Sequence, residues 1–124
     1  MEARKTQASA LIVDDEIDIC FLLSGILKNS NLDCRCVNSL AEAKKALAHY
    51  TPNILIIDNH LPDGLGLNFI RQVKENYPSV RIIMITAHDT YPDKQAALKE
   101  GVDSFIGKPF SRATISSTVD RLIN

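Results

Sequence analysis

The sequence lacks the features that would place it in several specialised classes. It carries 14 Lys and Arg against 15 Asp and Glu, a net charge of −1, so neither a nucleic-acid-binding nor a membrane-surface role is supported. No apolar run approaches membrane-spanning length, and residues 1–7 are polar, with no apolar stretch for export. Cys20, Cys34 and Cys36 are an odd number without zinc-like spacing. We therefore expect reduced, mostly packed thiols in a cytosolic protein.

The remaining composition is that of one ordinary globular domain. The chain has 124 residues, of which 45% are hydrophobic and 23% charged. A domain of this size buries roughly two-thirds of its unfolded surface, which is enough for a core without disulfides or metals. There are no repeats, low-complexity segments or linkers. We expect one domain over residues 8–124, preceded by a polar extension over residues 1–7.

Strand and helix patterns alternate five times along the chain. Short apolar runs predict strands, and apolar residues at helical spacing predict a helix after each of them. The strands are expected at 9–13, 32–37, 53–57, 80–85 and 104–106, and the helices begin near 16, 39, 67, 92 and 111. Five such units predict an α/β, doubly wound, five-stranded parallel sheet with helices on both faces and the flavodoxin-like strand order 2-1-3-4-5. The alternating polarity of 32–37 predicts that this strand lies at the edge.

Several local signals define the ends of these elements. Ser39, followed three residues later by Glu42, predicts a capping box at the start of the second helix. Pro92 is expected to be the first residue of the fourth helix, and Gly101 lies at that helix's C-terminal end. Residues 58–66 contain one proline and two glycines, so they are predicted to form a loop.

Polar side chains stand directly after four of the apolar runs. These are Asp14 and Asp15, then Asp58, Thr86 and Lys108. The C-terminal ends of parallel strands meet at one edge of the sheet, so these groups are expected to converge there. Carboxylates brought together repel each other and require a cation. The pattern therefore predicts a magnesium-dependent site that accepts a phosphoryl group.

Four short motifs carry a family resemblance. They are Asp14-Asp15, Asp58-Asn-His-Leu-Pro-Asp-Gly64, Thr86-Ala87 and Lys108-Pro109-Phe110. Each motif is weak alone, but all four in this order at strand ends are specific. From Leu11 to Ile123, the chain resembles the receiver domain of two-component response regulators, such as the chemotaxis regulators.

The resemblance implies a role for each carboxylate. Asp58 would be the nucleophile and phosphoacceptor, giving an acyl phosphate. Asp14, Asp15 and Asp58, together with the backbone carbonyl of His60, would hold Mg²⁺, which favours oxygen ligands and retains waters. A simpler alternative is that these aspartates cap the adjacent helix and loop.

The resemblance also assigns Lys108, Thr86 and Phe105. Lys108 would pair with Asp58 and then with a phosphoryl oxygen, and the bond before Pro109 would be cis. Thr86 would donate its hydroxyl to the phosphoryl group and move inward, and Phe105 would follow it. Many relatives carry tyrosine at this position, so Phe105 signals by packing alone. The alternatives are a solvated lysine, a loop-capping threonine and a core phenylalanine.

Two histidines lie beside the expected site, His60 two residues after Asp58 and His88 two after Thr86. In the family these positions flank the path of the water that hydrolyses the acyl phosphate, so either imidazole could set the phosphate lifetime. The alternatives are two ordinary loop histidines or a zinc site, and the neighbouring oxygens favour magnesium over zinc.

The resemblance implies a cytoplasmic signalling receiver that is not an enzyme beyond its own phosphorylation and slow autodephosphorylation. The phosphoryl group would come from a sensor histidine kinase or a histidine phosphotransfer protein. The surface of helix four, strand five and helix five would then switch toward a downstream protein, an output domain or a homodimer, without direct nucleic-acid or membrane binding. Stand-alone action, phosphorelay transfer and a place in a longer regulator stay open.

Two other classes of function remain as alternatives. One is a receiver-like interaction domain without phosphorylation, and the other is a small doubly wound phosphatase or flavin carrier. The sequence lacks Gly-x-Gly-x-x-Gly after the first strand and a P-loop lysine motif. The run Asp14-Asp15-Glu16-Ile17 also breaks the aspartate spacing of the aspartyl phosphatases.

Overall fold

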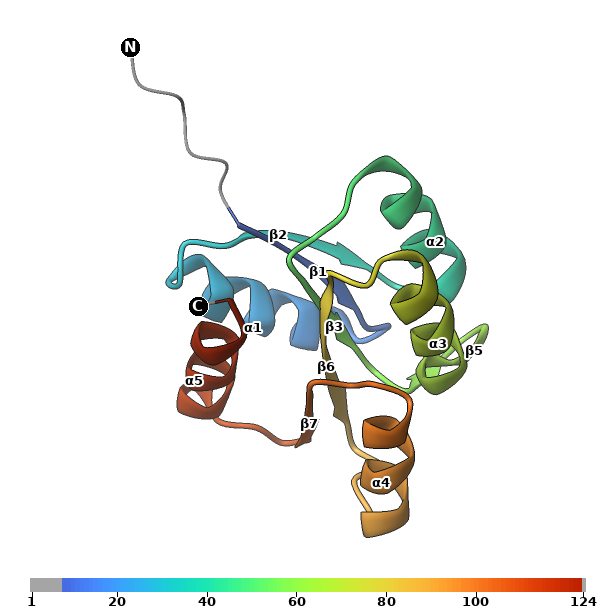
Figure 1. Ribbon diagram of the computed structural model, residues 1–124. Helices are drawn as coiled ribbons and strands as arrows, with labels where there is room; N and C mark the ends of the chain where they lie inside the picture. The colour runs from blue at the N-terminus through green and yellow to red at the C-terminus, as the bar shows by residue number, and fades with distance from the viewer. Residues whose placement is uncertain (1–7, 124) are drawn as a thin grey trace.

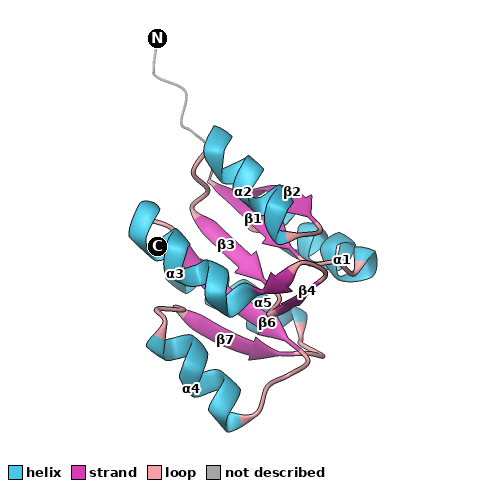
Figure 2. Ribbon diagram, turned by 90° about the vertical axis from the view of Figure 1, so that its right-hand side faces the viewer, coloured by secondary structure: helices cyan, strands magenta, loops and turns pink. Residues whose placement is uncertain are grey.

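A five-stranded parallel sheet forms the centre of the molecule (Figure 1). The computed structural model describes residues 8–123, so the extension expected at residues 1–7 lies outside the described part. The strands are β1 (Ser9–Val13), β2 (Asp33–Val37), β3 (Ile54–Ile57), β6 (Arg81–Thr86) and β7 (Ser104–Gly107). Their order β2-β1-β3-β6-β7 is the predicted 2-1-3-4-5 order, and Figure 2 shows all five pointing the same way.

The register of the central strands positions the site. β1 and β3 pair from Ala10↔Ile54 to Val13↔Ile57, so both strands end at the same level. The residues that follow them, Asp14 and Asp58, therefore lie next to each other at the C-terminal edge. All four residues of β3 are buried, as expected for the interior of a parallel sheet. β2 is only half buried and lies at the edge, which confirms the prediction from its alternating pattern.

Helices cover both faces of the sheet, as Figure 1 shows. On one face Ala10, Ile12 and Ile56 pack with residues of α1 and α5, and on the other Leu11 and Leu55 pack with residues of α2, α3 and α4. Alternate residues of each strand thus feed separate cores, as the strand period of two requires. The helices are α1 (Ile17–Lys28), α2 (Leu40–His49), α3 (Gly66–Asn76), α4 (Tyr91–Lys99) and α5 (Arg112–Ile123).

The helices α2 and α4 begin close to their predicted capping residues, with two differences in detail. The Oγ of Ser39 accepts the amide of Glu42 at 3.2 Å, but the Glu42 carboxylate accepts the amide of Asn38 rather than that of the cap residue. Thr90 caps α4, so Pro92 is its second residue and not its first. Both changes shift a contact by one residue and leave the helices in place.

The loop predicted over residues 58–66 contains a small antiparallel ladder. β4 (His60–Leu61) pairs with β5 (Gly64–Leu65), and α3 begins immediately afterwards. Gly66 is required there, because a Cβ on this residue would lie 2.6 Å from the backbone oxygen of Asp58. The predicted loop therefore contains a short ladder, and its last residue, Gly66, already belongs to α3.

The expectation of three reduced thiols was wrong. Cys20 of α1 and Cys36 of β2 form a disulfide with a Cα–Cα distance of 6.1 Å, which leaves Cys34 free. Spacing along the chain could not reveal this pair, because the fold brings the helix and the edge strand together. Burial raises the pKa of the Cys34 thiol to about 11, so this cysteine is a poor nucleophile. No helix among residues 8–123 is both long and apolar enough to cross a membrane.

Candidate functional site

The site is built around a partly buried lysine that contacts three carboxylates. The Nζ of Lys108 lies 2.6 Å from Glu16 Oε2, 3.0 Å from Asp14 Oδ2 and 3.2 Å from Asp58 Oδ2. Asp14 follows β1, Asp58 follows β3 and Lys108 follows β7, so three strands bring the charges together. The structure thus confirms the predicted convergence of these groups.

Backbone contacts fix Lys108 at the sheet edge. Its amide donates to the carbonyl of Thr86 at 2.9 Å, continuing the ladder in which Gly107 pairs with Thr86. The Lys108–Pro109 peptide bond is cis, as the resemblance implied. Burial alone would lower the pKa of Lys108, but hydrogen bonds to Glu16 and Asp14 and the charges of Asp14 and Asp58 raise it above its ordinary value. The ammonium is therefore charged at neutral pH.

Asp14 is the most enclosed of the acidic groups. Its Oδ1 accepts the amide of Glu16 at 2.9 Å, and its backbone oxygen accepts the side-chain amide of Asn38 at 3.1 Å. The simple capping role and the site role therefore coexist in one residue. Burial raises the pKa of Asp14, and the hydrogen bonds from Glu16 and Lys108 only partly oppose it. A bound cation would favour the charged form of Asp14 that burial disfavours.

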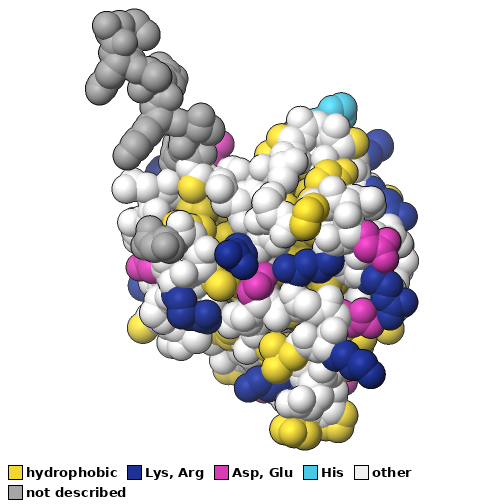
Figure 3. All heavy atoms as spheres, viewed as in Figure 1, with side chains coloured by type: hydrophobic (Ala, Val, Ile, Leu, Met, Phe, Trp, Pro, Cys, Tyr) yellow, Lys and Arg dark blue, Asp and Glu magenta, His cyan; other side chains and the backbone are white. Residues whose placement is uncertain are grey.

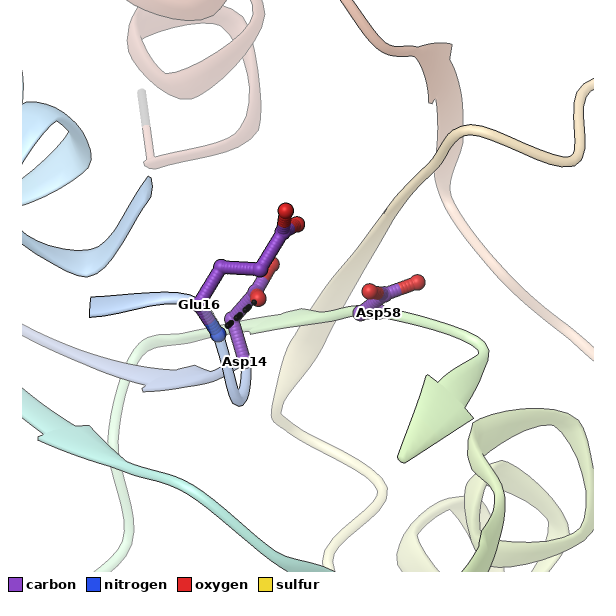
Figure 4. A group of neighbouring side chains, drawn as sticks. All are labelled: Asp14, Glu16 and Asp58. Carbon is purple, nitrogen blue, oxygen red and sulfur yellow. Dashed lines mark hydrogen bonds between the residues drawn. The ribbon is translucent and has the colours of Figure 1, made fainter. Parts of the chain in front are cut away.

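Three carboxylates form a group that could hold a metal ion, and Figure 4 shows Asp14 and Glu16 side by side with Asp58 on the neighbouring strand end. One oxygen from each of Asp14, Glu16 and Asp58 lies within 4.8 Å of the others. Asp15, predicted to belong here, is exposed and stands outside this group, so its metal role stays a prediction. Glu16 was not assigned from the sequence; the signal was a third acidic residue directly after Asp14-Asp15.

The loop after β3 supports the acceptor carboxylate. The amide of His60 donates to Asp58 Oδ1 at 3.3 Å. Asp63, the other acid of this loop, points elsewhere, because its two oxygens accept the amides of Leu40 and Ala41 at 2.9 and 3.0 Å. These backbone hydrogen bonds lower the pKa of Asp63. Asp63 thus caps α2, and Asp58 remains the acid directed at Lys108.

Thr86 and Phe105 lie on the same face of the sheet. Thr86 is buried at the end of β6, and its Oγ1 accepts the amide of His88 at 3.2 Å. Phe105 pairs with Met84, two residues before Thr86, and packs against the core beneath α2, α3 and α4. Both side chains therefore face the layer that contains α4. Their movement on phosphorylation stays a prediction.

His60 and His88 contact each other at the mouth of the site. Their ring centroids are 3.8 Å apart with an interplanar angle of 36°. One follows Asp58 and the other follows Thr86, so the two loops meet at this pair. The amide of His60 bonds to the Asp58 carboxylate and that of His88 to the Thr86 hydroxyl. A role of either histidine in phosphate lifetime stays a prediction.

A family model agrees with this arrangement. Residues 10–120 match the model described as the response regulator receiver domain. The chain belongs to this family. It is therefore a receiver domain of the two-component type, the class of phosphorylation-activated signalling receivers. The alternatives of a flavin carrier or a small phosphatase are set aside.

Individual relatives include longer regulators that this chain matches over one part of their length. It is 36% identical over 104 residues to the response regulator protein PilR of Pseudomonas aeruginosa, covering 84% of this chain and 23% of that protein. It is 31% identical over 113 residues to the DNA-binding transcriptional regulator NtrC of Escherichia coli, covering 91% and 24% respectively. The beryllofluoride-activated NtrC4 receiver domain dimer matches with a TM-score of 0.88 at 34% identity, over 92% of this chain and 94% of that one. The chain spans about a quarter of the length of PilR and of NtrC.

Proposed function

We propose that this receiver takes a phosphoryl group from a phosphohistidine onto Asp58. The observation that carries the proposal is the Asp58 carboxylate, which is buried at the end of β3 and held 3.2 Å from the Lys108 ammonium. A carboxylate oxygen of Asp58 forms a bond to phosphorus, and the P–N bond of the donor breaks. The imidazole nitrogen leaves with the electron pair. Lys108 stabilises the negative charge on the transferring group, and catalysis here is positioning and charge neutralisation.

Mg²⁺ is the cation that the site would hold. The donors are carboxylate oxygens, which suit magnesium better than zinc, and two of them belong to the buried Asp14 and Asp58. Asp15 would act through water, and the backbone carbonyl of His60 would complete the protein ligands. When bound, the ion neutralises charge that develops on the phosphoryl oxygens.

The output surface is the one formed by α4, β7 and α5. Thr86 and Phe105 face the layer of α4, and this helix has Ala97 as its one buried residue in the structure, so little packing opposes its movement. Figure 3 shows hydrophobic side chains exposed at the end of the molecule that α4 forms, and Tyr91 is among the exposed residues. A shift at Thr86 would therefore re-aim α4 toward a downstream protein, an output domain or a second receiver. Amide exchange with and without beryllofluoride tests this route, and changes confined to α1 and α2 would contradict it.

The phosphodonor would dock beside the site on α1. Ile17, Phe21 and Leu22 are exposed on this helix, which starts immediately after Glu16. Exposed apolar groups gathered on one helix mark an interaction surface. We propose a sensor histidine kinase or a histidine phosphotransfer protein as the partner, with the domain acting in the cytoplasm. The domain acts on its own phosphorylation alone and turns over no other substrate.

The contact between His60 and His88 bears on how long the phosphate lasts. Each imidazole borders the approach to Asp58 and can orient or obstruct a water molecule. Replacing either histidine with alanine should change the dephosphorylation rate several-fold and leave phosphate uptake intact. Following phosphate loss from pH 6 to 8 tests this, and equal rates in all three proteins would make the histidines bystanders.

Phosphorylation itself is tested by intact mass. The protein is incubated with acetyl phosphate and Mg²⁺, and one phosphoryl group should be gained. Asp58→Asn should gain none, and EDTA should suppress the gain in the unaltered protein. Asp63→Asn is the matched control, since Asp63 is the acid of the same loop that caps α2. Undiminished uptake in Asp58→Asn or in EDTA would refute the assignment.

A further inference from the structure

Glu16 holds one of the donors that the acceptor site needs. An ammonium has three N–H donors, and those of Lys108 face Glu16 at 2.6 Å, Asp14 at 3.0 Å and Asp58 at 3.2 Å. A phosphoryl group on Asp58 brings further anionic oxygens to the same ammonium. These oxygens take over the charge of the Asp58 carboxylate and compete with Asp14 and Glu16 for the three N–H donors.

The exposure of the three carboxylates identifies which contact is released. The side chains of Asp14 and Asp58 are 3% and 9% exposed, whereas that of Glu16 is 58% exposed. Water can therefore solvate the Glu16 carboxylate once it leaves Lys108, but it cannot do so for the other two. The Glu16 contact is also the shortest, so it keeps the lysine engaged until a stronger anion arrives.

The backbone of Glu16 is fixed while its side chain is free to turn. Its amide donates to Asp14 Oδ1 at 2.9 Å, and its carbonyl accepts the amides of Ile19 and Cys20, both at 3.1 Å, at the start of α1. Release of Lys108 therefore requires side-chain rotation alone and leaves the loop after β1 in place.

We propose that Glu16 is a positioning residue that competes with the incoming phosphoryl group for Lys108 and so limits phosphate uptake. This inference rests on the proposed function of Asp58. Before transfer the Glu16 carboxylate is paired with the Lys108 ammonium. The negative charge of Glu16 also repels the oxygens of an anionic phosphodonor. After transfer Glu16 turns to water and Lys108 contacts the phosphoryl group. In this role Glu16 acts through its contact with Lys108, and the metal would be held by Asp14 and Asp58.

The test compares phosphate uptake in Glu16→Gln with the unaltered protein across acetyl phosphate concentrations at saturating Mg²⁺. In this reaction the Asp58 oxygen bonds to phosphorus and acetate leaves. We expect the acetyl phosphate concentration at half-maximal rate to fall on the order of five-fold, the size of a partly exposed ion pair. Beryllofluoride should bind more tightly by a similar factor. Glu16→Asp, whose carboxylate is set back by one methylene, should lie between the two.

Two controls separate this role from others. Asp18→Asn removes the same charge from the exposed first turn of α1 and should leave uptake unchanged. Mg²⁺ affinity, followed by amide chemical shifts, should stay within two-fold in Glu16→Gln. Equal uptake by Glu16→Gln and the unaltered protein would overturn the inference, as would weakened Mg²⁺ binding, which would make Glu16 a metal ligand. Equal acceleration by Asp18→Asn would overturn it too. An unaltered protein that gains no phosphate contradicts the assignment of Asp58 instead.

Discussion

Replacing Lys108 with methionine tests the charge balance on which the site depends. The substitution keeps an apolar stem of similar length and removes the ammonium that contacts Asp14, Glu16 and Asp58. Two of these carboxylates are buried and would lose their cation. Breaking a fully buried ion pair costs about 3–5 kcal/mol. Because Glu16 is mostly exposed and the cluster opens to water, we expect a lower cost of about 2–4 kcal/mol at pH 7 without metal.

The assay is thermal unfolding with and without Mg²⁺. In a domain of this length 1 kcal/mol corresponds to roughly 4 °C, so the midpoint should fall by about 8–15 °C in EDTA. Added Mg²⁺ should restore more than half of this loss, because the ion supplies the missing positive charge and stabilises the folded state by mass action. The pKa of Lys108 is raised above its ordinary value of 10.5, so its stabilising effect is complete below that pH and is lost only as pH rises through the higher folded value.

Lys94→Met is the matched control, because Lys94 is exposed on α4. This variant should unfold within about 2 °C of the unaltered protein, as surface substitutions usually do. A Lys108→Met protein as stable as the control would refute the reasoning, and so would a loss that Mg²⁺ does not reduce. The first result would mean that the carboxylates are solvated, and the second that the cluster does not bind the ion.

Three further predictions follow from single contacts. Gly66→Ala should cost about 1–3 kcal/mol in urea unfolding and slow phosphate uptake, because the new Cβ would push against the backbone oxygen of Asp58 at 2.6 Å. Asp14→Asn should raise the metal-free unfolding midpoint at pH 7 by a few degrees and abolish the Mg²⁺ effect. Burial raises the pKa of Asp14, so Asp14 favours folding fully only below pH 3.8, and this contribution is lost as pH rises through the folded pKa. The higher midpoint of Asp14→Asn should therefore disappear in acid. Air-oxidised protein should weigh about two mass units less than reduced protein, and Cys36→Ser should remove this difference, because Cys20 and Cys36 are the paired thiols.

The architecture could be predicted because burial imposes a simple pattern on the chain. A strand covered on both faces, such as Ile54–Ile57, must be apolar throughout, and an edge strand such as Asp33–Val37 can alternate. The alternation of strand and helix patterns predicts the strand order. In a parallel sheet of this order the C-terminal ends of β1, β3 and β7 lie at the same edge. This is why the convergence of Asp14, Asp58 and Lys108 could be predicted from their positions directly after the strands.

The features that sequence did not reveal depend on side-chain direction and on contacts between distant segments. Asp15 and Glu16 are adjacent acids after the same strand, yet Glu16 turns toward Lys108 and Asp15 faces solvent. No periodicity distinguishes two residues in a turn of this kind. The pairing of Cys20 with Cys36 depends on how α1 packs on β2, which the spacing of 16 residues does not encode.

The charges of the site explain why a nearly neutral protein can act as a phosphorylation switch. The chain has a net charge of −1, but three of its carboxylates share one ammonium at the edge of the sheet. Burial disfavours the charged form of Asp14 and raises its pKa. A bound Mg²⁺ would relieve the repulsion between these carboxylates, and a phosphoryl group would add negative charge again. Because Lys108 is bonded through its amide to Thr86, a redistribution of its contacts acts directly on the strand end that borders α4.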